Sequence, residues 1–263
     1  MSELNLLGES LRAALRPKRL IVAGLLIVLP AIIALMWRMA SGTERFEAPE
    51  TYNTLALEIV FRFILTLLAV LYGTGALSQE IEGRTIVYLL TRPIPRWRVL
   101  LAKLVSAWIL ITAATCLSTI LLAFAAFGGK PDTAMLLGDL KVIPAGAAAY
   151  SALFCLLSTF LSRPLLYALL YGVGWENIAS FFPGGFSRLS ILTYLRTLSP
   201  HLKDSAQDVS GGGGTSGALF ASDPSVITRP QCWLGLGIAI VMGLGLAILI
   251  FSKREYAPRE EAG

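Results

Sequence analysis

The chain has 263 residues, of which 55% are hydrophobic and 15% charged, and its formal net charge is +5. A soluble domain usually carries about 25% charged residues. Here the apolar residues form long blocks, and a helix that crosses a bilayer needs roughly 20 of them in succession. This distribution excludes an ordinary soluble domain and predicts an all-α integral membrane protein. The basic residues lie at the ends of the blocks, where they set topology, so we expect no nucleic-acid partner.

Six apolar blocks predict transmembrane helices within a single membrane domain covering residues 1–263. The predicted spans are about 20–37, 57–77, 101–127, 142–161, 165–182 and 233–251. The first block is too long for the apolar region of a signal peptide and no A-x-A site follows it, so we expect it to be retained. Before it, leucines recur at helical spacing, at Leu4, Leu7, Leu11 and Leu15. They predict an amphipathic helix in the membrane interface, with a solvated leader as the alternative.

Lys and Arg residues in the short loops predict the orientation of the chain. Most of them lie in the N-terminal segment, in residues 78–98 and after residue 251, so we expect both termini in the cytoplasm. The long connection 183–232 is then extracytoplasmic. Its first part has an apolar residue at every third position, at Phe186, Leu189, Leu192, Leu195 and Leu198, with Arg188 and Arg196 off this stripe. This pattern predicts an amphipathic helix at the membrane surface.

Charged residues within the predicted spans are few. Glu58 and Arg62 are four positions apart on one helical face, which predicts a structural ion pair. Glu176 and Asn177 form a possible intramembrane polar site, since a carboxylate at membrane depth suggests a functional role. They lie near the outer end of their span, so an interfacial or helix-packing role is equally open.

The last span carries small residues four positions apart, at Gly235, Ala239, Gly243 and Ala247. This stripe predicts a packing face that another helix approaches closely, unless it is a chance feature of a Gly- and Ala-rich span. The spacing of the three cysteines and the single histidine, Cys116, Cys155, Cys232 and His201, fits neither a disulfide framework nor a zinc site. The sequence therefore predicts no metal site and no catalytic residue.

The most informative stretch is the segment 78–98 and its continuation to Lys103. It combines acidic, basic and proline positions: Glu80, Glu82, Gly83, Arg84, Thr85, Arg92, Pro93, Pro95 and Arg96. It resembles the segment E-x-E-x-G-T…L-x-x-P-I-x-R…K between the second and third spans of ABC-2 transporter permeases. Two positions depart from that pattern: Arg84 is inserted between Gly83 and Thr85, and Pro95 stands where a small polar residue is commoner.

The resemblance implies a permease subunit of an ATP-binding-cassette transporter in the plasma membrane, of the bacterial inner-membrane type. In such permeases this segment forms a coupling helix that docks on a separate ATPase subunit, and most members export their cargo. Six spans also look like half of a translocation pathway, so we expect a dimer with a second permease copy or homologue, in contact with membrane lipids. We expect ATP and Mg²⁺ on the partner, because the only Gly-Lys pair, Gly129-Lys130, lacks the rest of a P-loop.

Two other classes of protein remain as alternatives. A membrane-embedded lipid-modifying enzyme needs convergent polar groups, such as paired carboxylates with a metal or a Ser with a His, and the spans offer no such set. A stand-alone secondary transporter or channel usually shows inverted repeats or ionisable relays within its spans, and neither is evident. Dependence of activity on ATP separates the transporter subunit from these two classes.

Overall fold

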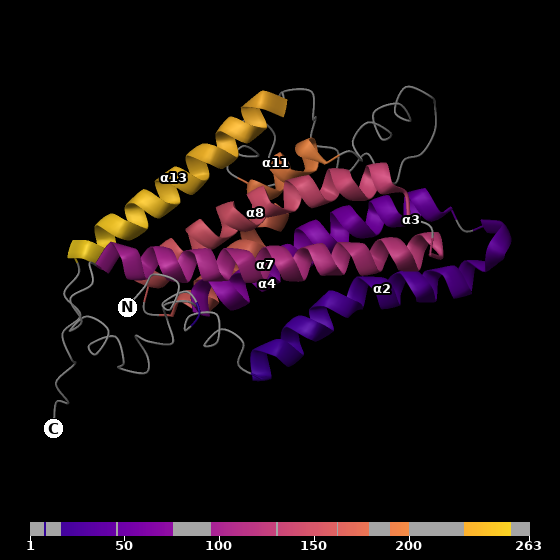
Figure 1. Cartoon of the computed structure of the whole chain (residues 1–263), viewed down its shortest axis with the longest axis horizontal. Helices are drawn as coiled ribbons and strands as arrows, with labels where there is room; N and C mark the ends of the chain where they lie inside the picture. The colour runs from indigo at the N-terminus through magenta and orange to yellow at the C-terminus, as the bar shows by residue number, and fades with distance from the viewer. Residues whose placement is uncertain are drawn as a thin grey trace.

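The computed structural model describes residues 8, 17–45, 47–75, 96–129, 131–161, 163–178, 190–199 and 229–253, and all regular structure in them is helical (Figure 1). The elements are α2 (Pro17–Arg45), α3 (Ala48–Leu55), η1 (Ala56–Ile64), α4 (Leu65–Ala69), η2 (Val70–Thr74), α7 (Arg96–Phe127), α8 (Thr133–Phe160), α9 (Pro164–Leu169), η3 (Leu170–Trp175), α10 (Glu176–Ile178), α11 (Ile191–Leu198) and α13 (Arg229–Lys253). Elements labelled η are π-helical. The predicted all-α class is confirmed.

Five helices among these residues are long and apolar enough to cross a membrane: Arg19–Ala40, Ala48–Thr74, Trp97–Phe127, Thr133–Phe160 and Arg229–Phe251. A shorter apolar helix, Pro164–Trp175, occupies the place of the predicted span 165–182. The chain is therefore a multi-pass membrane protein. A total of six spans and the cytoplasmic location of both termini stay predictions.

Two spans begin earlier than the hydropathy pattern predicts, at Ala48 and Thr133 in place of residues 57 and 142. Pro49 lies in the first turn of α3, where its missing N–H costs no hydrogen bond. The side chain of Asp132 accepts a hydrogen bond from the Ala134 N–H at 2.9 Å and so caps α8. The polar residues that suggest loops therefore lie in the first turns of these helices. Likewise α7 begins at Arg96 and α13 at Arg229, inside the predicted segments 78–98 and 183–232.

The second and fourth spans form the centre of the bundle, and the first and last lie at its sides. In the most apolar part of each helix, 56% of the residues are buried in Ala48–Thr74 and Thr133–Phe160, against 22% in Arg19–Ala40 and Arg229–Phe251. In Figure 1, α2 packs along α7 and α13 packs along α8, while α7 and α8 lie between them. The exposed apolar side chains of α2 and α13 are those expected of helices that face lipid.

The helix predicted in the long connection is present over Ile191–Leu198, as α11. Its residues Leu192, Leu195 and Leu198 are buried. The helix packs against α8, α13 and η1 (Figure 1). Its apolar side therefore faces other helices of the bundle, whereas its location at the membrane surface stays a prediction. Phe186, Arg188 and Leu189 lie outside the described residues.

Candidate functional site

The predicted coupling segment falls largely outside the described residues, which resume at Arg96 after Gly75. Glu80, Glu82, Gly83, Arg84, Thr85, Arg92, Pro93 and Pro95 all belong to this undescribed part. Arg96 is the first residue of α7, although its side chain is not among those described. At the start of α7, the Arg98 guanidinium lies 5.2 Å from the centre of the Trp97 ring, and both side chains are exposed. The segment therefore joins the end of the second span to the start of α7.

Glu176, the first residue of α10, is fully buried and caps the N-terminal end of α11. Its Oε1 accepts hydrogen bonds from the Tyr150 hydroxyl at 3.0 Å and the Ile191 N–H at 3.3 Å. Its Oε2 accepts from the Ser190 hydroxyl and, at 3.3 Å, from the Leu192 N–H. A carboxylate is favourable there because the first N–H groups of a helix lack partners within the helix.

Asp139 holds the other end of α11. This carboxylate lies in α8 and is fully buried. It accepts a hydrogen bond from the Tyr52 hydroxyl at 2.8 Å and from the Ser199 hydroxyl at 3.2 Å. Ser199 directly follows α11, and Tyr52 lies in α3. Asp139 therefore joins the fourth span to the start of the second and to the end of α11.

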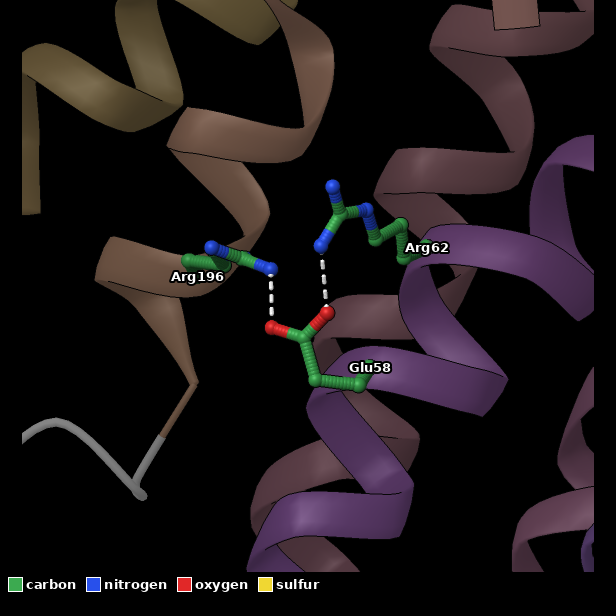
Figure 2. Close-up of polar contacts among 3 residues, drawn as sticks. All are labelled: Glu58, Arg62 and Arg196. Carbon is green, nitrogen blue, oxygen red and sulfur yellow. Dashed lines mark hydrogen bonds and ion pairs between the residues drawn. The ribbon is translucent and has the colours of Figure 1, made fainter. Parts of the chain in front are cut away.

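Glu58 makes a third connection, to Arg196 of α11 and to Arg62 of its own helix (Figure 2). One of its oxygens accepts a hydrogen bond from Nη1 of Arg62 at 2.5 Å, and the other accepts from Nη2 of Arg196 at 2.5 Å. The side chains of Arg62 and Arg196 are 18% and 24% exposed, and that of Glu58 is 43% exposed. The ion pair between Glu58 and Arg62 is thus present, and Arg196 of α11 is an additional partner.

Comparison with known families decides the class of protein. Residues 4–256 match the family described as ABC-2 family transporter protein. The chain belongs to the ABC-2 family. No curated protein matches it. The family match supports the role of an ABC permease, a membrane subunit for transport, and a partnership with an ABC ATPase.

In this ABC-2 protein, the three carboxylates suit the positioning of a helix and not a reaction. They belong to three different helical elements, yet all bind α11 or the residue next to it: Glu58 through Arg196, Asp139 through Ser199 and Glu176 through the helix N-terminus. Within the described ranges, no group of three His, Cys, Asp or Glu residues could hold a metal ion. Each carboxylate accepts hydrogen bonds from donors of the chain itself, so the arrangement fixes α11 relative to η1, α8 and α10.

Sequence reasoning singled out Glu176 and Asn177, and the structure brings Glu176 into contact with Tyr150 and Ser190. The side chain of Asn177 lies outside the described residues. A role of either residue in the transport pathway stays a prediction. Sequence reasoning missed Asp139, Tyr52, Tyr150, Ser190 and Ser199. A serine directly before an apolar helix is a capping signal that points to Ser190, whose hydroxyl accepts from the Thr193 N–H at 3.3 Å.

The small residues of the last span of this ABC-2 protein lie against two helices. A side-chain carbon built on Gly235 would lie 2.9 Å from the ring of Tyr194 in α11. One built on Gly243 would lie 3.3 Å from the backbone of Ala152 in α8, and Ala247 is fully buried. Ala239 is partly exposed. Gly235 and Gly243 therefore allow α13 to approach α11 and α8 closely.

Proposed function

We propose that the chain is the permease subunit of an ABC exporter in a plasma membrane of the bacterial inner-membrane type. It forms the translocation pathway as a dimer with a second copy or a homologue. A separate ATPase subunit binds ATP and Mg²⁺ and drives transport. The family match over residues 4–256 carries this proposal, because it includes the segment whose sequence resembles the ATPase-docking element of such permeases.

The helix that follows the segment is suited to transmit movement from the ATPase into the membrane. The 32 residues of α7 form one helix without an internal proline, which is about 48 Å long at ~1.5 Å per residue. This helix begins at Arg96, directly after the undescribed part of the segment, and packs against both α2 and α8. A displacement of its first turn by the ATPase therefore moves the neighbouring spans as rigid bodies.

The charges of the segment supply the recognition. Glu80 and Glu82 are available for basic residues of the ATPase, while Arg84, Arg92 and Arg96 are available for acidic residues or for lipid phosphates. Complementary charge at such a contact governs which partner binds and how fast it associates.

Purification of the tagged protein in mild detergent tests the proposal. The wild type is compared with a variant in which Glu80, Glu82 and Arg92 are changed to Ala, and with a control in which the exposed Glu47 and Glu50 are changed to Ala. We expect an ATPase to co-purify with the wild type and the control and to be lost from the triple variant.

Each other outcome has a definite meaning. Retention of the ATPase by the triple variant would keep the transporter subunit but place its docking contact elsewhere. Absence of any ATPase from the well-folded wild type would contradict the proposal and favour a membrane protein that works alone.

A further inference from the structure

The first span carries an arginine at each end of its apolar stretch, and each arginine lies against a glycine that ends another helix. Arg19 lies against Gly75, the residue that follows η2 at the end of the second span. Arg38 lies against Gly128, directly after α7, where an added side-chain carbon would come within 2.5 Å of Nη1 of Arg38. At Gly75, such a carbon would overlap Nη1, Nη2 and Cζ of Arg19.

These positions suit a guanidinium group for two reasons. The last carbonyl groups of a helix lack partners within the helix and carry a partial negative charge. The guanidinium offers five N–H donors in a planar fork, which approaches the backbone closely only where no side chain intervenes. Gly75 is buried and Arg19 is partly exposed.

The two contacts lie at different kinds of connection. Gly128 is followed by a turn with Gly129 at a φ of 96° and then by α8, whose first residue is Thr133. Gly75 is the last described residue before the segment 78–98. Arg19 therefore acts where the chain leaves the second span toward this segment.

The first span also packs along the helix that follows the segment. It packs along α7, which begins where the segment ends. The Ser118 hydroxyl of α7 donates a hydrogen bond to the backbone carbonyl of Ile27 in α2 at 3.0 Å. A path of contacts thus runs from Gly75 through Arg19 and α2 to α7.

We propose that Arg19 is a positioning residue for the ATPase-coupling segment: it fixes the end of the second span at Gly75, three positions before the segment begins. The inference rests on the proposed function for its consequence, which is the transmission of nucleotide-driven movement. An arginine that only anchors the first span at the membrane surface has no need of Gly75, and this difference makes the two roles separable.

The variants are Arg19→Ala, Arg19→Lys and Gly75→Ala. Gly75 has a φ of −70°, which alanine adopts readily, and the added methyl group meets the far end of a long side chain. Gly75→Ala therefore displaces the guanidinium from its position while both the charge and the fold are kept. The matched controls are Arg38→Ala, which removes the corresponding contact at the other end of α2, and Gly24→Ala, whose methyl group meets no atom within 4 Å.

The first readout is limited trypsin digestion of the purified permease in detergent, which needs no partner. We expect Arg19→Ala and Gly75→Ala to change the rate of cleavage after Arg84 several-fold, with cleavage after Arg45 unchanged. Arg19→Lys should restore part of the wild-type rate, because lysine keeps the positive charge but lacks the planar set of guanidinium donors. An equal change at both sites, or none at either, would overturn the inference and leave Arg19 as a general stabilising or anchoring residue.

The second readout is ATP hydrolysis by the co-purified complex, relative to the ATPase purified alone. A ratio of one means that the permease no longer affects the ATPase. Arg19→Ala and Gly75→Ala should move the ratio several-fold toward one, although the same amount of ATPase stays bound. Arg38→Ala and Gly24→Ala should leave the ratio unchanged. A wild-type ratio in both variants would overturn the coupling role. If the wild type binds no ATPase, the proposed function fails, and the digestion still decides whether Arg19 positions the segment.

Discussion

Arg196 of α11 donates a hydrogen bond to Oε1 of Glu58 at 2.5 Å, although 138 positions separate the two residues in the chain. The other oxygen of Glu58 is bound by Arg62, four positions away on the same helix (Figure 2). One carboxylate thus has a local partner and a distant partner. The local pair exists as soon as the helix forms, whereas the distant pair needs α11 in its place.

Replacement of the two arginines should therefore have unequal effects on stability. Arg62→Gln removes a pair spaced four residues apart, which is worth about 0.3–0.5 kcal/mol on a helix. Arg196→Gln removes a tertiary connection, for which couplings of about 0.5–3 kcal/mol are typical. We expect the lower half of that range, because Glu58 is 43% exposed and solvent weakens the pair.

Thermal unfolding in detergent measures this difference, with Glu58→Gln and the double variant Glu58→Gln/Arg196→Gln completing a double-mutant cycle. The double variant should be more stable than the sum of the single losses predicts. Equal losses from Arg62→Gln and Arg196→Gln would show that Arg196 does not fix α11.

Asp139 should matter more for stability than any exposed carboxylate near it. Asp139→Ala leaves the buried hydroxyl group of Tyr52 without its acceptor, and a buried unsatisfied polar group costs about 1–3 kcal/mol beyond the lost packing. Asp132→Ala is the matched control, since Asp132 is an exposed cap of the same helix and its loss costs roughly 1 kcal/mol.

The measurement is again the unfolding temperature, together with the yield of monodisperse protein. Tyr52→Phe/Asp139→Ala should recover part of the stability lost in Asp139→Ala, because it removes the donor along with the acceptor. Equal losses in Asp132→Ala and Asp139→Ala would contradict the anchoring role of Asp139.

The apolar blocks made the helices of this protein predictable, because the length of an apolar run is a local property of the sequence. The pair Glu58–Arg62 was predictable for the same reason. Asp139 was missed because a charged residue beside Lys141 and Pro144 suggests a loop. Its hydrogen-bond donors are the hydroxyl groups of Tyr52, 87 positions earlier in the chain, and of Ser199. Neither spacing nor hydropathy indicates which distant hydroxyl groups meet a given carboxylate.

The main role expected for Glu176 is to stabilise the fold, and a role in transport is tested separately. Its two oxygens accept hydrogen bonds from Tyr150, Ser190 and two backbone N–H groups, and Glu176→Gln replaces one of these oxygens with an NH₂ group that faces donors. We expect a destabilisation of about 1–3 kcal/mol and a lower yield of folded protein. Glu50→Gln, at an exposed carboxylate in the first turn of α3, should change neither.

Transport per folded molecule separates the two roles of Glu176. With an anchoring role, Glu176→Gln should lower transport only in proportion to folded protein, and Ser190→Ala should lower stability in the same direction. Loss of transport at normal yield and stability would favour a place in the transport pathway. Unchanged transport at normal expression would leave no pathway role for this residue.

Two glycines of α13, Gly243 and Gly237, give a prediction about helix packing. Gly243 lies against the backbone of Ala152, which does not move aside, whereas a side chain at Gly237 meets no atom within 4 Å. Gly243→Leu should therefore push α13 away from α8, at a typical overpacking cost of about 1–3 kcal/mol. Gly237→Leu should be neutral or slightly stabilising, because leucine favours a helix over glycine by roughly 0.5–1 kcal/mol.

Thermal unfolding of both variants makes the comparison. The unfolding temperature should fall in Gly243→Leu and should stay at the wild-type value or rise slightly in Gly237→Leu. An equal loss in both variants would show that Gly237 also lies against a packed surface, such as a second permease copy. No loss in either variant would contradict the close packing of Gly243 against Ala152.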